Sequence, residues 1–99
     1  MFSMISKSFT FEAAHKLSNT KNNVNNNIHG HSFAVEVFIP DKNNNIKSKG
    51  LILDFSIFKK KIDKIKNTLD HSFLNDIEGL EYPTLENIGY WIFNKLEKD

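Results

Sequence analysis

The sequence contains no cysteine and no arginine, and each absence removes a class of function. Without cysteine there is no disulfide framework and no thiolate ligand, which fits a reducing cytoplasm. All 13 basic residues are lysines, set against 12 acidic residues, so no arginine fork is present to read base edges. The densest basic cluster, Lys59-Lys60-Lys61, fits the solvated face of a helix. We therefore predict neither disulfides nor nucleic-acid binding.

Long apolar runs are also absent, and a membrane-spanning helix needs about 20 consecutive apolar residues. The N-terminus lacks the basic and then apolar layout of a secretory signal peptide. We therefore expect a cytoplasmic protein that does not bind membranes. Its 99 residues are enough for one small domain, residues 1–99, with a modest core and no internal repeat or linker.

Two stretches alternate between apolar and polar side chains and predict β-strands. Between residues 8 and 15 the odd positions hold phenylalanine, alanine and histidine, while the even positions before residue 14 are polar. Between residues 29 and 39 the odd positions hold two histidines and then four apolar residues, and Pro40 ends the stretch. The asparagine-rich stretch Lys16 to Ile28 predicts a long loop between the strands, and Asn43 to Asn45 a second loop.

The period changes after Asp54, where apolar residues recur every three or four positions and predict a helix capped by that aspartate. The apolar positions of this helix are Phe55, Phe58, Ile62, Ile65 and Leu69. A loop is predicted at residues 75–79. A second helix follows, with Thr84 as its N-cap. Its apolar positions are Leu85, Ile88, Trp91, Ile92 and Leu96.

The order strand, strand, helix, helix predicts an α+β fold. Two amphipathic helices need a broad apolar sheet to cover, and a hairpin of two strands is marginal by itself. Either neighbouring copies of the chain lend strands to the sheet, or a C-terminal piece is absent.

Three histidines are placed as a metal site would need them. His29 and His31 are two positions apart in a strand, so their side chains leave the same face about 6.5 Å apart. His15 ends the preceding strand, and a hairpin would bring it alongside. Three neutral imidazoles that leave a position open are typical of catalytic zinc, although iron or nickel would also accept them. The alternative is a group of partly buried histidines hydrogen-bonded to the backbone.

Asp70-His71 is a second candidate site. An aspartate can fix the tautomer of a histidine and raise its proton affinity, which suits a general acid or base. The alternative is a histidine at the end of a helix, where it meets the negative end of the helix dipole.

A series of segments along the chain resembles one known family. The segments, in order, are Phe11-Glu12-Ala13-Ala14-His15, His29-Gly30-His31-Ser32, Gly50-Leu51-Ile52-Leu53-Asp54-Phe55, Leu69-Asp70-His71, Leu74-Asn75-Asp76 and Pro83-Thr84-Leu85-Glu86-Asn87. Together they resemble the 6-pyruvoyl-tetrahydropterin synthase family, and most of all its bacterial 6-carboxy-tetrahydropterin synthase branch, which serves queuosine synthesis.

The resemblance implies the tunnelling fold, an antiparallel sheet with two helices packed on one face, in trimers or hexamers. It implies zinc held by His15, His29 and His31, with Asp70 and His71 as the proton-transfer pair. The implied substrate is a small molecule, 7,8-dihydroneopterin triphosphate. The implied products are 6-carboxy-5,6,7,8-tetrahydropterin, acetaldehyde and triphosphate.

The chain departs from the family pattern at two places. Asn25 stands where the family has a catalytic cysteine, and an amide does not ionise as a thiol does. The chain stops at Asp99, before two family strands and a glutamate that anchors the pterin, so we expect a C-terminally short domain. These departures leave two alternatives: a non-catalytic remnant that binds zinc or pterin, and the branch that forms 6-pyruvoyl-tetrahydropterin.

Overall fold

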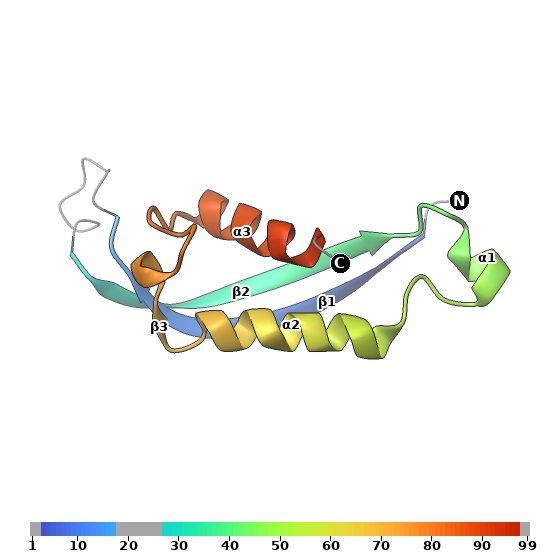
Figure 1. Ribbon diagram of the computed structural model, residues 1–99, viewed down its shortest axis with the longest axis horizontal. Helices are drawn as coiled ribbons and strands as arrows, with labels where there is room; N and C mark the ends of the chain where they lie inside the picture. The colour runs from blue at the N-terminus through green and yellow to red at the C-terminus, as the bar shows by residue number, and fades with distance from the viewer. Residues whose placement is uncertain (1–2, 18–26, 98–99) are drawn as a thin grey trace.

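The computed structural model describes residues 3–17 and 27–97 and shows a long strand pair followed by helices (Figure 1). In chain order the elements are β1 (Met4–His15), β2 (His29–Pro40), α1 (Asn45–Lys49), α2 (Phe55–Leu69), β3 (Ser72–Phe73), the 3-10 helix η1 (Leu74–Asp76) and α3 (Leu85–Glu97). The predicted α+β order of two strands and then two main helices is confirmed. Most of the predicted loop between the strands, residues 18–26, lies outside the described residues.

The two long strands pair antiparallel along their whole length, from Met4 opposite Pro40 to His15 opposite His29. The predicted alternation is present in β1, where the odd positions from 9 to 15 are buried. The sheet is mixed rather than purely antiparallel, because the two-residue strand β3 pairs in parallel with the other edge of β1, in the order β2-β1-β3. A strand this short carries no periodic signal, so the sequence did not indicate it.

Helix α2 begins as predicted, with the Asp54 carboxylate accepting the backbone N–H of Ser56 at 2.9 Å. Four of its five predicted apolar positions are buried: Phe58, Ile62, Ile65 and Leu69. Phe55 is the exception, with 53% of its surface exposed and the Lys7 ammonium 5.4 Å from its ring centroid. Periodicity assigns a residue to one side of a helix, but it does not show whether another element lies beside it at that level.

Helix α3 also begins as predicted, because Thr84 Oγ1 accepts the backbone N–H of Asn87 at 3.2 Å. Ile88 and Ile92 are buried on its inner face, whereas Leu85, predicted for that face, is 72% exposed. Leu85 is the first residue of the helix, and its side chain lies ahead of the turns that pack through Ile88 and Ile92. As with α2, the pattern correctly predicted the side of the helix but not how far the packing extends.

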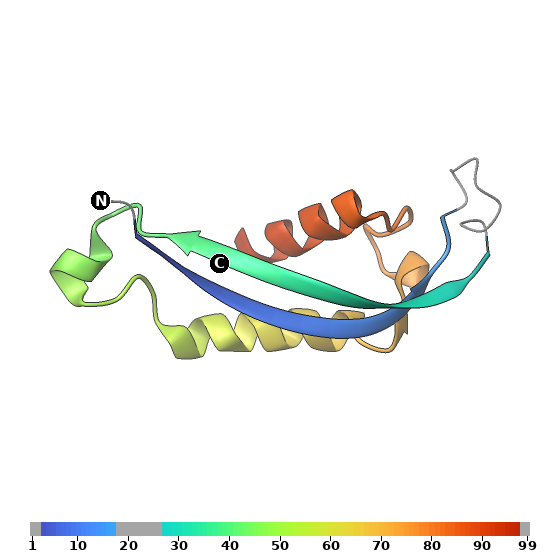
Figure 2. The same ribbon diagram turned by 180° about the vertical axis from the view of Figure 1, so that it is seen from behind.

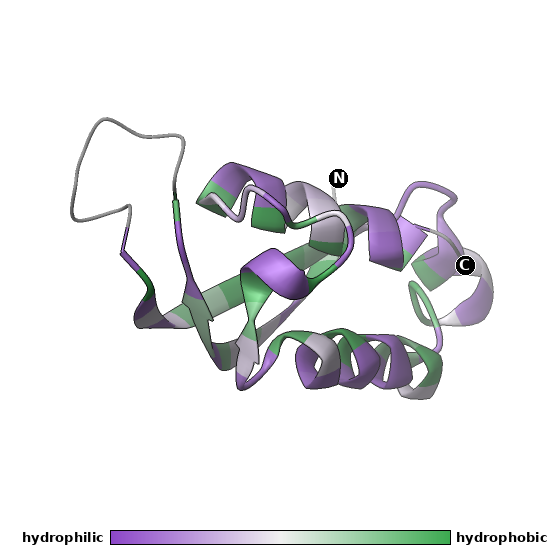
Figure 3. Ribbon diagram, turned by 60° about the vertical axis from the view of Figure 1, so that its left-hand side comes forward, coloured by the Kyte–Doolittle hydropathy of each residue, from purple (hydrophilic) through white to green (hydrophobic). Residues whose placement is uncertain are grey.

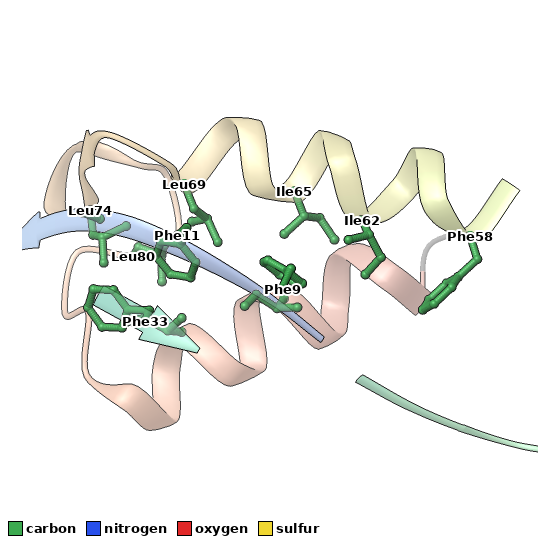
Figure 4. Close-up of a cluster of buried hydrophobic side chains, with 12 residues drawn as sticks. Phe9, Phe11, Phe33, Phe58, Ile62, Ile65, Leu69, Leu74 and Leu80 are labelled. Carbon is green, nitrogen blue, oxygen red and sulfur yellow. The ribbon is translucent and has the colours of Figure 1, made fainter. Parts of the chain in front are cut away.

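Both main helices lie on the same face of the hairpin. In Figure 2, the view from the opposite side, the two strands lie in front of the helices. Apolar residues recur along α2 between polar ones, as the colours of Figure 3 show. The side chains of the core come from the strands, both helices and the segment between them (Figure 4). The core consists of Phe9, Phe11, Ala13, Phe33, Phe58, Ile62, Ile65, Leu69, Leu74, Leu80, Ile88 and Ile92. Phe11 and Phe33 stack across the strand pair, with ring centroids 4.9 Å apart.

Two short helices overlap the edges of predicted loops: α1 begins at Asn45, the last residue of one, and η1 includes the first two residues of the other. Asn45 begins α1 because both oxygens of Asp41 accept backbone N–H groups, from Asn45 and Ile46. Helix η1 ends inside the predicted loop 75–79, and the turn after it contains Gly79 with a φ of 92°. Both helices are short, of five and three residues, and apolar periodicity does not report elements of this length.

Away from the histidines, the last part of β2 borders an open apolar groove of about 390 Å³. Val37, Phe38, Leu53, Phe93 and Leu96 are among its lining residues. Phe38 and Phe93 are each 56% exposed. No helix within residues 3–17 and 27–97 is long and apolar enough to cross a membrane.

We predict that Leu69→Ala lowers the free energy of unfolding by about 2–5 kcal/mol, because Leu69 is fully buried and the lost methyl groups leave a cavity. Leu85→Ala is the matched control and should cost no more than about 0.5 kcal/mol, since Leu85 is mostly exposed. Urea unfolding followed by Trp91 fluorescence measures both. Equal losses from the two substitutions would contradict the packing described here.

Candidate metal centre

The three predicted metal ligands converge at the end of the hairpin where β1 stops and β2 starts. His15 lies opposite His29, and Ala13 lies opposite His31, so the register alone brings the histidines onto adjacent positions of one face. His15 is buried, His29 is half-buried and His31 is exposed. The sequence predicted a buried face for His29 and His31. Burial is complete only for His15, and the other two imidazoles remain accessible from outside.

The imidazole rings are close enough to share one ion. Ring centroids are 4.8 Å apart for His15 and His29, 5.1 Å for His15 and His31, and 4.6 Å for His29 and His31. One ring nitrogen from each histidine can be chosen so that all three lie within 4.8 Å of one another. The rings meet edge to face at 68–88°, as separate ligands of one centre would, rather than stacking.

The hydrogen bonds of His15 fit a metal ligand. Its Nδ1 lies 3.0 Å from the carbonyl oxygen of Pro83, which can only accept, so Nδ1 carries the proton. Its Nε2 is buried and has no hydrogen-bond partner, unlike every other buried side-chain nitrogen or oxygen in the described part of the chain. A buried polar atom without a partner is costly, and a bound metal would satisfy this one.

His29 repeats the arrangement, because its Nδ1 lies 2.8 Å from the carbonyl oxygen of Asn27 and leaves Nε2 for another partner. Metal-binding histidines usually donate their other ring N–H to a backbone carbonyl or a carboxylate in this way. The alternative of histidines satisfied by backbone groups therefore holds for the Nδ1 atoms only. The second nitrogen of His15 is the one that a metal ion fits.

The protein environment keeps His15 in the form that binds metals. Burial lowers the pKa of the His15 imidazole, and the neighbouring His29 and His31 lower it further, against the opposing hydrogen bond to Pro83. A lowered pKa favours the neutral ring, and only a neutral imidazole nitrogen can coordinate a metal.

The second candidate pair, Asp70 and His71, lies where α2 meets β1. Asp70 Oδ1 accepts the backbone N–H of Glu12 at 2.8 Å, and the backbone N–H of His71 is donated to the Glu12 carbonyl. His71 has a left-handed φ of 57°, and its Nδ1 lies 3.1 Å from Asp70 Oδ2. The adjacent side chains do contact each other, so the acid-histidine pair is present in addition to the helix-end position.

The His71 imidazole is 80% exposed and lines an open hollow of about 520 Å³. The same hollow is bordered by His31, Glu12 and Ser32, and the Ser32 hydroxyl donates to Glu12 Oε1 at 2.7 Å. One member of the histidine cluster and the acid-histidine pair therefore border one space. Glu12, Ser32 and Pro83 stand in the segments that resemble the family, but the sequence assigned them no role, because neither a backbone carbonyl nor a cross-strand contact can be read from residue types. Asn25, at the family's cysteine position, lies outside the described residues.

We predict that Asp70→Asn destabilises the metal-free protein near neutral pH, and that this difference shrinks as the pH falls below about 4. The hydrogen bond from Glu12 lowers the pKa of the Asp70 carboxyl in the folded state. A depressed carboxyl pKa stabilises the fold above the unfolded value of about 3.9, and this stabilisation is lost as the pH falls through the lower folded value. Urea unfolding at a series of pH values measures it, and a difference that stays constant to the acid limit would contradict it.

Comparisons with known proteins agree with this geometry. The family model of 6-pyruvoyl tetrahydropterin synthase matches residues 4–99. A 6-carboxy-5,6,7,8-tetrahydropterin synthase from Synechocystis is 45% identical over 98 residues, covering 96% of this chain and 75% of the relative. A dihydroneopterin monophosphate aldolase from Pyrococcus furiosus is 38% identical over 90 residues, covering 91% and 71%.

The fold also matches a solved structure of the same family. The Caenorhabditis elegans 6-pyruvoyl tetrahydropterin synthase superposes with a TM-score of 0.76 at 25% identity, covering 98% of this chain and 78% of that one. The tunnelling fold expected from the resemblance is therefore confirmed. The chain belongs to the 6-pyruvoyl tetrahydropterin synthase family.

Proposed function

We propose that the protein is a zinc-dependent lyase that converts 7,8-dihydroneopterin triphosphate and water into 6-carboxy-5,6,7,8-tetrahydropterin, acetaldehyde and triphosphate. The observation that carries the proposal is the convergence of His15, His29 and His31, with the buried Nε2 of His15 unpartnered, in a chain of this family. The Synechocystis relative, named as a 6-carboxy-5,6,7,8-tetrahydropterin synthase, supports this choice of product within the family.

The three histidines would hold the metal through ring nitrogens, with Nε2 of His15 as the buried ligand. A set of three imidazoles without a thiolate suits zinc and leaves a position open for substrate. When bound there, zinc supplies a Lewis acid that polarises a substrate oxygen. The partly accessible His29 and exposed His31 leave the outer side of the cluster open to a small molecule.

The proton-transfer role falls to Asp70 and His71. Asp70 is fixed by the Glu12 N–H, so its second oxygen can hold the His71 ring by Nδ1. This leaves the other nitrogen of the exposed imidazole able to give or take a proton in the hollow shared with His31. Because Asn25 offers no thiol, we assign the proton transfers of the reaction to this pair.

The absence of any cysteine also supports a second candidate, a protein that binds zinc and pterin without turning substrate over. The relative named as an aldolase, which is 38% identical, supports a third candidate, in which the side chain of the pterin substrate is cleaved to a different product. Product analysis separates all of these, because each leaves a different pterin in solution.

The test is a turnover assay of the zinc-loaded full chain with 7,8-dihydroneopterin triphosphate, read by mass spectrometry, together with the zinc content of two variants. We expect His29→Ala to lose stoichiometric zinc and all turnover. His71→Ala is the matched histidine substitution outside the cluster. It should keep one equivalent of zinc and lose turnover by a factor of about 10²–10⁴, the usual contribution of a general acid or base.

The outcomes separate the candidates. Acetaldehyde with 6-carboxy-tetrahydropterin would establish the lyase. Intact substrate with zinc bound would favour the non-catalytic protein, and one equivalent of zinc retained by His29→Ala would remove the three-histidine site itself.

We further propose that the protein works as a homo-oligomer, a trimer or a hexamer. In the described part of the chain, β2 is an edge strand, and it carries none of the lysines that often protect such edges from pairing. The adjoining groove exposes Phe38 and Phe93, which a second copy would cover.

If copies of the chain cover this edge and groove, the apparent melting temperature should rise with protein concentration, because assembly then stabilises the fold by mass action. Sedimentation velocity at the same concentrations reports the species present. A sharp cooperative melt at a dilution where only monomer sediments would contradict the proposal.

A further inference from the structure

The segment between α2 and α3 contacts the end of β1 through Asp70 and His71 at Glu12 and through β3 at Ala13 and Ala14. Two further contacts follow at the next two residues. His15 is hydrogen-bonded through Nδ1 to the carbonyl of Pro83, and Lys16 is hydrogen-bonded through its backbone to the side chain of Asn75. The first contact involves a candidate metal ligand directly. The second lies one residue further along the chain and involves no ligand. Asn75 belongs to one of the segments that resemble the family, but the sequence assigned it no role.

The Pro83 carbonyl is available to His15 because helix α3 does not use it. The first backbone hydrogen bond of the helix runs from the Ile88 N–H to the carbonyl of Thr84, one residue beyond the proline. A carbonyl accepts only, so this contact sets the His15 tautomer with the proton on Nδ1 and the lone pair on Nε2. The tautomer thus depends on where the backbone of Pro83 is held.

Asn75 holds that backbone in place relative to the strand. Its Oδ1 accepts the backbone N–H of Lys16 at 2.9 Å, and its Nδ2 donates to the Lys16 carbonyl at 2.9 Å. The same Nδ2 also lies 3.4 Å from the carbonyl of Glu81, two residues before Pro83. A carboxamide has the acceptor and the donors that this three-way contact requires, whereas a carboxylate has acceptors only.

Buried side chains and hydrogen bonds hold the stretch between Asn75 and Pro83, and they link the position of one to that of the other. Leu74, Leu80 and Pro83 are fully buried on either side of the contact. Trp91 Nε1 donates to the carbonyl of Glu78 at 3.1 Å. Gly79 fits only as glycine, because its φ is 92° and an added Cβ would lie 3.1 Å from the Trp91 ring.

We infer that Asn75 is a positioning residue for the metal centre. By bridging Lys16 and Glu81, it keeps the end of β1 and the Pro83 carbonyl at the separation that holds His15 with Nε2 directed to the metal. This inference rests on the metal centre proposed above. It adds a residue that touches neither metal nor substrate and acts through the backbone on either side of the ligand.

The test is metal affinity measured on the full chain, with Co²⁺ and Zn²⁺ titrated against a chelator of known affinity. Asn75→Ala and Asn75→Asp should each raise the dissociation constant about tenfold, the lower end of the roughly 10–100-fold range found when groups behind metal ligands are altered. The Co²⁺ absorption spectrum should shift as well, because the geometry around His15 changes.

The matched control is Asn45→Ala. It removes one hydrogen bond of the same kind, from a side-chain amide to a backbone carbonyl, between Asn45 Nδ2 and Ile52. Asn45 begins α1, at the opposite end of the hairpin from the histidines (Figure 1). Asn45→Ala should leave the dissociation constant and the Co²⁺ spectrum unchanged. Unchanged affinity in both Asn75 variants, or an equal loss in Asn45→Ala, would overturn the inference.

The wild-type protein distinguishes failure of the inference from failure of the proposed function. If wild-type chain binds no stoichiometric metal, the metal centre itself is wrong and the inference falls with it. If the wild type binds metal but the Asn75 variants do not fold, long-range ¹H–¹⁵N NMR of metal-free wild type decides the question. A proton on Nδ1 of His15, with slowly exchanging amide protons on Asn75, supports the inference, and a proton on Nε2 overturns it.

Discussion

The register of the β1–β2 hairpin is the constraint on which the rest of the molecule depends. It sets His15 opposite His29 and stacks Phe11 on Phe33, so the metal centre and the core use the same face of the same strand pair. A slip of one residue would move every side chain of one strand to the other face. The apolar positions of both strands therefore protect the site, because a one-residue slip that took the histidines off this face would also expose the phenylalanines.

Burying His15 at the end of the hydrophobic core has an energetic cost, because one of its ring nitrogens loses its hydrogen bonds to water and gains none from the protein. The Nε2 atom of His15 is buried among apolar and aromatic groups and makes no hydrogen bond. Charging the ring would be worse, and burial lowers its pKa accordingly. A neutral buried lone pair is a poor arrangement for stability but a suitable one for a metal ligand. We therefore regard His15 as the member of the cluster whose environment is most specific to metal binding.

The sequence was sufficient to predict the strands, both capped helices and the grouping of the three histidines, because these depend on local periodicity and on positions two residues apart. It could not predict that Phe55 and Leu85 would be exposed, since the packing of the first turn of a helix depends on whether another element lies beside it. It also missed the contacts of Pro83 and Asn75 with β1. Those contacts join residues more than fifty positions apart and depend on backbone N–H and carbonyl groups, which do not identify a residue type.

Residues 12–16, the end of β1 and the residue after it, connect the two candidate sites through the backbone. The backbone N–H of Glu12 donates to the Asp70 carboxylate, and its carbonyl accepts the backbone N–H of His71. These two bonds fix the proton-transfer pair against the strand. His15 and Lys16, a few positions later, fix the segment that ends at Pro83. The metal ligands and the proton-transfer pair are therefore both positioned by the end of β1. His29 and His31 pair with it across the hairpin, and Asp70 and His71 are hydrogen-bonded to it. Because Phe9, Phe11 and Ala13 bury one face of that strand in the core, the separation of the two sites is set by the packed part of the molecule.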